Sequence, residues 1–408
     1  MLNRIWGGIF LIALLTGTIN SVTQGASVIN AMAASLFDSA KLGVEISIGL
    51  IGALALWLGL FQIAEAAGIV AFLARQTTPV LHRLMPSVPK DHPAFGSISM
   101  NVAMSMLGID NGALPSGLKA MRELEALNTT PSVATKAQQM FLVYMTTSVT
   151  LFPVSILSYR LQAGAANPAD IFLPLIITGY AGLLVGLGYM SAVLKINWLN
   201  LKSALALLLL MVVLSGLALL AATWPAQELN EKAGLFGNVL ILAVLAWFIA
   251  VGLYKRLAIF DLFTRGASQG FTLAVELIPY LVGMLVAIGL LRSSGAFSML
   301  QSSLEWLCRL SGVDDLWTQV LPHGLMKLFS GSGARSLMLE AFNFHGVDSL
   351  VGHLSAVVQG AFDTTFYVLV ACAAAAKLHN LGHAVTGALL ANGTSFVVAV
   401  LCTQFFFQ

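Results

Sequence analysis

Long apolar runs in a chain with very few charges are the feature that most constrains how this sequence can fold. About nine of these runs reach roughly 20 residues, the length with which an α-helix crosses the hydrocarbon core of a bilayer. Only 9% of the 408 residues are Asp, Glu, Lys or Arg, against roughly 25% in soluble domains. The sequence therefore predicts an all-α polytopic membrane protein. It excludes a soluble enzyme, a nucleic-acid binder and a disordered chain.

We predict about nine transmembrane helices. They lie near residues 5–22, 43–63, 138–159, 170–194, 201–223, 235–254, 273–291, 349–371 and 384–405. The first follows Arg4 and has the outline of a signal peptide. We interpret it as a retained helix, because the internal repeat described below requires it.

The distribution of Lys and Arg predicts the orientation, since these residues gather in cytoplasmic loops. Arg4 places the N-terminus in the cytoplasm, and the cations between residues 75 and 90 and at 255–265 fit the same side. Glu228 and Glu231 mark the loop between the fifth and sixth helices as external. Arg160, Arg292 and Arg309 depart from this pattern on the outer side. We expect a multi-pass protein of a bacterial inner membrane.

Two segments look too broken to span a bilayer. Amphipathic stretches at 68–85 and 295–310 lead into segments interrupted by Gly, Ser and Pro at 94–128 and 317–345. Broken helices in a membrane are tolerated only where protein or a water-filled cavity satisfies the freed backbone groups. Interrupted segments at matching positions of two halves point to a transporter binding site.

The two halves resemble each other weakly but in a shared order, which predicts an internal repeat. The alternative is a chance match between two hydrophobic sequences. The paired stretches are 67–73 with 294–300, 107–113 with 328–334, 119–121 with 340–342 and 148–152 with 363–367.

We predict a first repeat at 1–200, a connector helix at 201–230 and a second repeat at 231–408. The extra crossing of the connector makes the second repeat enter from the opposite side. Inverted repeats of this kind are typical of secondary transporters.

Four motifs resemble a known family. Residues 101–121 and 164–170 look like spore maturation protein A, and residues 321–335 and 363–369 look like spore maturation protein B. The chain thus resembles a fusion of the two over nearly its full length. Both belong to the nucleoside recognition, or Gate, domain group, which also includes segments of concentrative nucleoside transporters and of ferrous iron transporters. The resemblance implies a transporter-like core with two Gate-type repeats and leaves the substrate open.

Polar residues at the breaks are the candidates for binding a polar solute. Unwound backbone with small polar side chains can hold such a solute, and helix N-termini favour an anionic group. The alternatives are ordinary helix capping and, for Arg335, a salt bridge to Glu340. The candidates are Asn101, Asp110, Asn111, Ser330, Ser332 and Arg335.

Ionisable residues within apolar helices are the candidates for gating or for coupling to Na⁺ or H⁺, because charge in a bilayer needs a partner or water. Lys119 and Glu340 occupy equivalent repeat positions, so we predict that they pair near the midplane. Glu45, Glu276 and Asp363 are further candidates. The alternative for these five residues is a structural or interfacial role. Asp363 lies where the resemblance would favour a neighbourhood richer in glutamate.

The sequence predicts no enzyme, since the Ser332 region lacks the strand of a hydrolase nucleophile elbow. It also predicts no metal or cofactor site. The favoured hypothesis is a transporter that moves a small polar solute, such as a nucleoside-like molecule, by alternating access. The alternatives are a non-transporting scaffold of envelope or spore maturation, and a translocator of a lipid-linked precursor. The expected partners are the lipid bilayer and the solute, with no nucleic acid, and a homo-oligomer is one of the states left open.

Overall fold

The computed structural model describes residues 2–106, 108, 110–147, 150, 153–196, 226–299, 302–303, 306 and 316–408. Within these ranges the chain is helical, and its extended pairing is limited to an isolated bridge between Val133 and Asn380. An all-helical fold is therefore confirmed for the described part of the chain.

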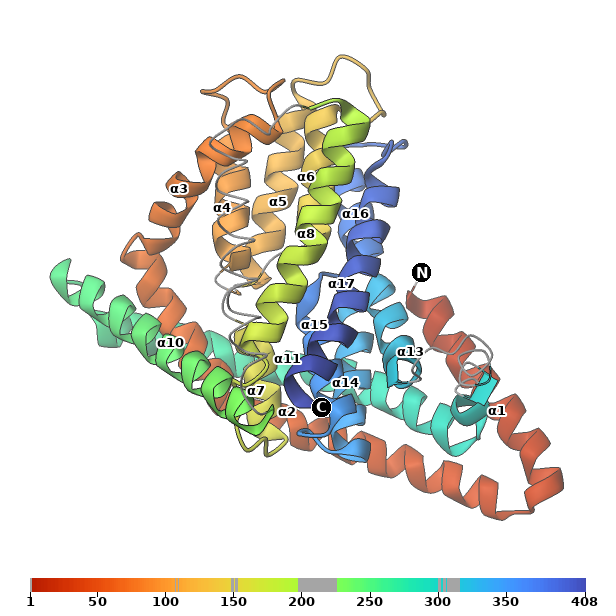
Figure 1. Ribbon diagram of the computed structural model, residues 1–408. Helices are drawn as coiled ribbons and strands as arrows, with labels where there is room; N and C mark the ends of the chain where they lie inside the picture. Colours follow the sequence, from red (N-terminus) through yellow and green to blue (C-terminus); the bar gives the residue numbers. More distant parts are fainter. Residues whose placement is uncertain are drawn as a thin grey trace.

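The first eight helices run in order from the N-terminus (Figure 1). They are α1 Leu2–Gln24, α2 Ser27–Ala66, α3 Ile69–Leu84, α4 Ala94–Met106, α5 Asp110–Glu125, α6 Lys136–Thr147, α7 Val154–Gln162 and α8 Phe172–Leu194. The remaining helices follow residue 226. They are α10 Ala226–Tyr254, α11 Ile259–Ser293, α13 Leu316–Phe329, α14 Gly331–His345, α15 Leu350–Ala361, α16 Thr365–Ala375 and α17 Ala384–Phe407.

Several helices have the length and composition of membrane spans. Four segments of the described chain are long and apolar enough to cross a bilayer: 27–66, 172–194, 350–375 and 384–407. Shorter apolar helices cover 6–22, 241–254 and 281–293. These features fit a polytopic membrane protein. The predicted span at 201–223 lies outside the described residues.

Two predicted spans differ from the structure in continuity. The helix expected at 138–159 is divided into α6 and α7, and the helix expected at 349–371 is divided into α15 and α16. Pro153 lies at the first division as the N-cap of α7, a position where its missing N–H costs no helical hydrogen bond. The second division at Phe362–Thr364 has extended backbone without a proline.

Helices α2 and α11 are much longer than a single perpendicular span. α2 has 40 residues and α11 has 35, which correspond to about 60 Å and about 50 Å of helix. The hydrocarbon core is about 30 Å thick. The two helices pack along each other and cross the lower part of the molecule obliquely (Figure 1). Each must therefore tilt steeply or extend beyond the bilayer.

Glycine makes the close packing of α2 and α11 possible. A Cβ atom on Gly270 would lie 2.6 Å from the Cα and backbone nitrogen of Ala55. Small residues let helix backbones approach closely in membranes, where van der Waals contact contributes strongly to association. Any larger side chain at this position would force the two helices apart.

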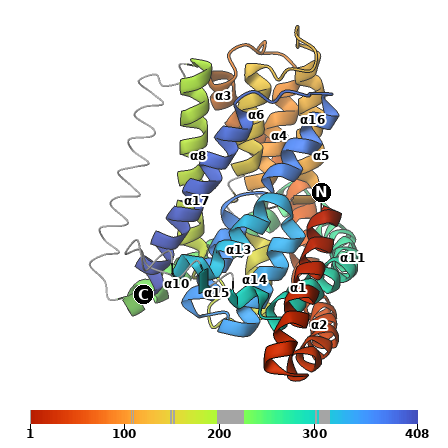
Figure 2. The same cartoon turned by 90° about the vertical axis from the view of Figure 1, so that its right-hand side faces the viewer.

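Two helical hairpins occupy opposite ends of the molecule. α4 and α5 lie in the upper half of Figure 1, whereas α13 and α14 lie in the lower half, and Figure 2 shows the same separation. α8 and α17 run side by side between these regions. Both hairpins contact α16, and α13 also contacts α17.

Both ends of the molecule combine early and late segments of the chain. At the upper end, the backbone N–H of Ala134 donates to Asn380 at 2.8 Å, and that of His379 donates to Ser132 at 2.8 Å. At the lower end, the N–H of Ala166 donates to the Asp348 carboxylate at 2.9 Å. The two largest apolar cores also mix residues from both predicted repeats. The two predicted repeats therefore share their apolar cores.

Candidate functional site

The α13–α14 break lies where the sequence predicts it. α13 ends at Phe329 and α14 begins at Gly331. The Ser330 hydroxyl accepts a hydrogen bond from the Gly333 N–H at 3.0 Å and lies 3.2 Å from the Ser332 hydroxyl. Ser330 thus caps α14, the structural role that the sequence left open for it. The cap holds a pair of hydroxyls at the start of this helix.

The divided helices α6–α7 and α15–α16 meet through their backbones. The N–H of Asp363 donates to the carbonyl of Thr146 at 3.0 Å. The Asp363 carboxylate accepts from the N–H of Thr364 at 2.6 Å. The end of α6 and the gap before α16 are therefore joined directly, and Asp363 uses its side chain to satisfy a freed backbone donor.

The hairpin α13–α14 packs against the same gap. A Cβ atom on Gly331 would lie 2.8 Å from the Thr364 hydroxyl, and the Phe329 and Phe366 rings stack with their centroids 5.0 Å apart. Asn392 of α17 donates to the Thr365 hydroxyl at 2.5 Å. The N-termini of α14 and α16 thus lie together at one place. We refer to this meeting point of residues 329–332 and 363–366 as the break junction.

The other hairpin contributes Asn101 from its first helix. The Asn101 side chain is 2% exposed and its amide donates to the Ala113 carbonyl at 2.6 Å. Its amide oxygen is buried and has no hydrogen-bond partner among the described atoms. A buried acceptor without a partner is costly and is available to a ligand.

The predicted pair Asp110 and Asn111 begins α5, directly after the break that follows Met106. The placement of their side chains lies outside the described part of the structure. Both hairpins contact α16, since α5 and α13 each pack against it.

Further polar side chains are buried near these helices. The imidazole Nε2 of His323 lies 2.9 Å from the amide oxygen of Gln359, and both residues are buried. Lys327 is also buried, one turn after His323 on α13. Buried polar groups of this kind in membrane proteins mark functional positions more often than packing.

The predicted pairing of Lys119 with Glu340 is wrong. Lys119 lies 3.8 Å from Glu123 on the same helix, and its side chain is 69% exposed. Glu340 instead forms an ion pair with Arg292. The physical reason is the direction of each helix face: Lys119 lies on an outward face of α5, whereas Glu340 faces the end of α11. Arg292 also covers the ring of Phe344, with 4.2 Å from its guanidinium carbon to the ring centroid.

Other predicted residues have their own partners. Glu45 lies 3.6 Å from Lys41, and both side chains are more than half exposed. Arg335 lies over the ring of Tyr159, with 5.4 Å from its guanidinium carbon to the centroid, and the alternative salt bridge to Glu340 is not formed. Glu276 lies within α11, and its side chain is outside the described residues.

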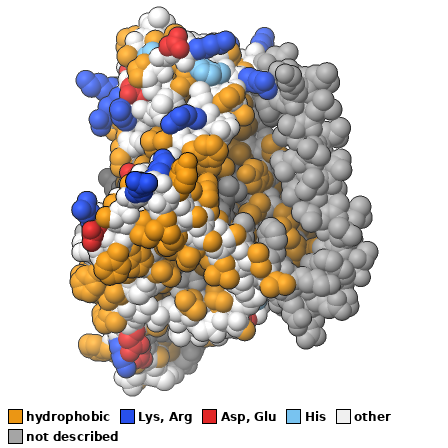
Figure 3. All heavy atoms as spheres, turned by 90° about the vertical axis from the view of Figure 1, so that its left-hand side faces the viewer, with side chains coloured by type: hydrophobic (Ala, Val, Ile, Leu, Met, Phe, Trp, Pro, Cys, Tyr) orange, Lys and Arg blue, Asp and Glu red, His pale blue; other side chains and the backbone are white. Residues whose placement is uncertain are grey.

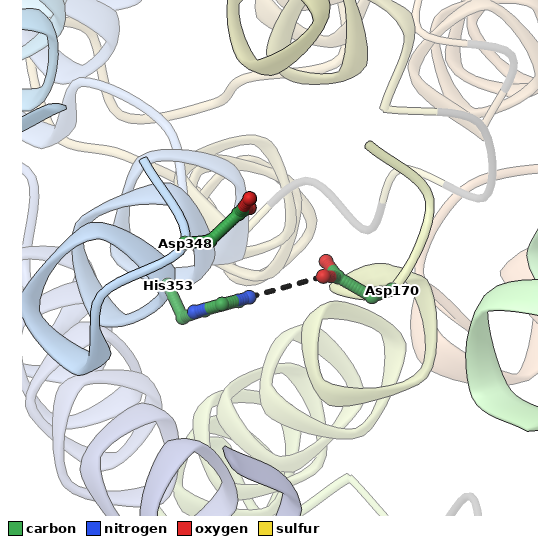
Figure 4. A group of neighbouring side chains, drawn as sticks. All are labelled: Asp170, Asp348 and His353. Atoms are coloured by element: carbon green, nitrogen blue, oxygen red, sulfur yellow. Dashed lines mark hydrogen bonds and ion pairs between the residues drawn. The ribbon is translucent and has the colours of Figure 1, made fainter. Parts of the chain in front are cut away.

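The sequence missed a buried ionic network at the lower end of the molecule. The Arg160 side chain has no exposed surface, and its Nη2 atom lies 2.9 Å from one oxygen of Asp170 and 3.1 Å from an oxygen of Asp348. His353 Nε2 lies 3.0 Å from Asp170 (Figure 4) and 3.4 Å from Arg160 Nη2. Two carboxylates thus compensate one buried guanidinium. We call these four residues the Arg160 network.

Four different segments bring the Arg160 network together. Arg160 belongs to α7, Asp170 precedes α8, Asp348 lies between α14 and α15, and His353 is in the first turn of α15. The His353 ring stacks on Phe407 with 3.8 Å between centroids. The Arg160 network therefore connects the first half of the chain to the second half and to the C-terminal turn of α17.

The acceptor atoms of the network also have the spacing of metal ligands. One ligand atom each from Asp170, Asp348 and His353 lies within 4.8 Å of the others. However, Arg160 Nη2 lies within 3.4 Å of all three residues. The guanidinium already holds the position that a cation would need. The arrangement is consequently an internal ion network, and a metal does not fit it while Arg160 is in place.

One sequence signal pointed to this network. Arg160 is a cation on the predicted outer side, against the general bias of Lys and Arg, and a charge that is out of place needs partners. Asp170 lies only ten residues from Arg160, but no feature of the sequence indicated the second carboxylate, because Asp348 is 188 residues away in the chain.

Comparisons with known proteins identify two relatives. No family model matches the chain. Spore maturation protein A of Bacillus subtilis is 34% identical over 188 residues, which make up 46% of this chain and 91% of that protein. Spore maturation protein B of the same organism is 32% identical over 164 residues, 40% of this chain and 90% of that protein. The chain belongs to the family of spore maturation proteins A and B, and its similarity to both is that of a fused A/B-like protein.

Proposed function

We propose that this protein is an inner-membrane transporter that moves a small polar solute, with a nucleoside-like molecule as one candidate, by alternating access. The solute binds at the break junction of the second Gate-type repeat, where Asp363 meets the end of α6 in the first, inverted repeat. The coupling ion in this proposal is H⁺ or Na⁺. The N-terminus faces the cytoplasm, as the distribution of Lys and Arg favours.

The order of the helices supports two repeats. A long helix, a helical hairpin, a divided helix and an upright helix occur as α2, α4–α5, α6–α7 and α8. The same series occurs as α11, α13–α14, α15–α16 and α17. The hairpins approach from opposite ends (Figure 1), as inverted repeats require. Discontinuous helices that meet in the middle of a membrane protein are the usual solute site of such transporters.

The break junction is the observation that carries the proposal. The N-termini of α14 and α16 lie together there, with Gly331 against Thr364, so N–H groups and two positive dipole ends are directed to one place. The hydroxyls of Ser332 and Thr364 add donors and acceptors. This chemistry suits a neutral polar solute that has several hydrogen-bonding groups, because the Asp363 carboxylate at the same place disfavours an anion.

A second candidate is a non-transporting scaffold of envelope or spore maturation. The names of the two relatives favour it, because they describe a process and not a transported substance. A scaffold gives no physical reason for the unpartnered buried oxygen of Asn101 or for the two adjoining helix N-termini. The transporter therefore accounts for more of the structure.

Uptake by reconstituted protein tests the proposal. Purified protein is first screened by thermal shift against nucleosides, amino acids, sugars and organic acids, and each hit is assayed for uptake into proteoliposomes. Thr364→Val should lower uptake strongly while the protein still folds. Thr394→Val is the matched control, because Thr394 is half-buried on α17 and its hydroxyl donates to the Leu390 carbonyl of the same helix. The proposal fails if no solute binds, or if both variants lower uptake equally.

A further inference from the structure

Helix α3 presents two different faces. One side is buried in the protein through residues such as Ile69, Val70 and Leu81. The other side exposes about half of Phe72 and of Val80. A helix with one face in the protein, and with apolar and basic side chains mixed on the other, is typical of a membrane interface.

A basic cavity opens at the C-terminal half of this helix. Its volume is about 660 Å³, within the range of small-molecule pockets. Three of the residues that line it are cations, and none is a carboxylate. The lining residues, which we call the α3 pocket, are Arg75, Thr78, Pro79, His82, Arg83 and Lys90.

The floor of the α3 pocket is held in place by α4. The Thr78 hydroxyl lies 3.0 Å from that of Ser99 and donates to the Ala74 carbonyl at 3.0 Å. The His82 ring packs on Phe95 with 3.9 Å between centroids. The cavity is therefore a fixed feature of two packed helices.

Two of the three cations of the α3 pocket, Arg75 and Lys90, have no acidic partner in the described part of the protein. Figure 3 shows that Lys and Arg side chains gather in the upper half of this face and that hydrophobic side chains cover much of the area beneath them. Cations that border an apolar surface are positioned for the phosphates of a bilayer.

We propose that the α3 pocket binds the phosphodiester head group of an anionic phospholipid, with the acyl chains along the exposed side chains of Phe72 and Val80. Positive charge on this segment places it in the cytoplasmic leaflet, where basic pockets between helices recognise anionic head groups. The phosphate oxygens accept hydrogen bonds from Arg75, Arg83 and Lys90, and the arginine guanidinium suits two of these oxygens at once. This proposal is independent of the transport function.

Native mass spectrometry of the full chain in detergent micelles tests this site. The probes are phosphatidylglycerol and phosphatidylcholine with the same acyl chains, and inorganic phosphate. The triple variant Arg75→Gln, Arg83→Gln and Lys90→Gln should bind phosphatidylglycerol about a hundredfold more weakly than the unmodified chain. The control triple variant removes three exposed cations elsewhere, at Lys195, Arg265 and Lys377, and should bind like the unmodified chain.

Each outcome has a defined meaning. Preferential retention of phosphatidylglycerol that weakens with salt, and that is lost only in the pocket variant, supports the proposal. Equal retention of both lipids would overturn it, as would an equal loss of phosphatidylglycerol binding in both triple variants. It would also be overturned if inorganic phosphate, at the same concentration as the lipid, displaced phosphatidylglycerol. If the pocket triple variant does not fold, Arg75→Gln alone, in the exposed middle of α3, serves as the test, with Arg265→Gln as its control.

Discussion

Replacing Arg160 with methionine should destabilise the protein more than any other single removal of charge. Arg160 is fully buried, and Asp170 and His353 are each 4% exposed. Methionine fills much of the volume but leaves the Asp170 carboxylate buried without its cation. Breaking a buried ion pair from one side costs about 3–5 kcal/mol. Arg160 also donates to the Val347 carbonyl at 3.2 Å, so this carbonyl would lose a donor as well.

The exposure of each carboxylate predicts a graded response. Asp348 is 41% exposed, so Asp348→Asn should cost only about 1 kcal/mol. Asp170→Asn should cost several times as much, because its carboxylate is buried. The double variant Arg160→Met, Asp170→Asn should recover part of the loss, since it no longer buries an unpaired charge. Arg122→Met, on the exposed face of α5, is the control and should cost less than about 0.5 kcal/mol.

Reversible unfolding in mixed detergent micelles, followed by tryptophan fluorescence, measures these free energies. The expected order of stability loss is Arg160→Met, then Asp170→Asn, then Asp348→Asn, then the control. A loss below about 1 kcal/mol for Arg160→Met would refute the reasoning. An Asp348→Asn variant as unstable as Asp170→Asn would refute it as well.

Three further predictions concern packing and pH. Gly331→Ala should lower the free energy of unfolding by about 1–3 kcal/mol, because its Cβ would lie 2.8 Å from the Thr364 hydroxyl. The double variant with Thr364→Ala should restore most of that loss in the same micelle assay, and no restoration would contradict the contact. Gly270→Leu should separate α2 from α11 and greatly reduce the yield of folded protein, measured by gel filtration, whereas an unchanged yield would argue against their close approach. Partial burial, with Arg292 as a second cause, lowers the pKa of His345 in the folded protein. As the pH falls through about 6.5, the imidazole is therefore protonated in the unfolded chain before it is protonated in the folded one. Stability should decline below that pH, and His345→Gln should reduce the decline between pH 7.5 and pH 5.5; an identical decline would contradict the assignment.

The helices and their breaks were largely predictable from the sequence. Glycine, serine and proline interrupt apolar runs for local reasons, and the α13–α14 break at Ser330 lies where these residues predict it. The extent of α2 was not predictable, because Ser, Asn, Asp and Lys residues interrupt the apolar pattern of its first part. The helix continues there since it packs on other helices, as the 3.1 Å contact between the hydroxyls of Ser35 and Ser293 shows.

The ionic partners were not predictable from the sequence. Repeat symmetry paired Lys119 with Glu340, yet a repeat register does not reveal which face of a helix a side chain occupies. Each of these residues has a different partner in the structure. The Arg160 network joins Arg160 and Asp170 to Asp348 and His353, 188 and 183 residues further along the chain respectively, and only the three-dimensional fold brings the two pairs together. The candidates of the break junction were easier to predict than the ionic partners, because a helix breaks close to the residues that cause the break.

The accessibility of one position near the outer end of each hairpin tests the inverted repeat, on which the transport proposal depends, most directly. Thr129 follows the α4–α5 hairpin and Asn343 lies at the end of the α13–α14 hairpin, and both are exposed. Each is replaced by cysteine in a chain whose native cysteines are changed to alanine. The variants are then labelled with a membrane-impermeant maleimide in intact cells and in inverted vesicles. The account predicts labelling of position 343 in cells and of position 129 in inverted vesicles; labelling of both positions from the same side would contradict it.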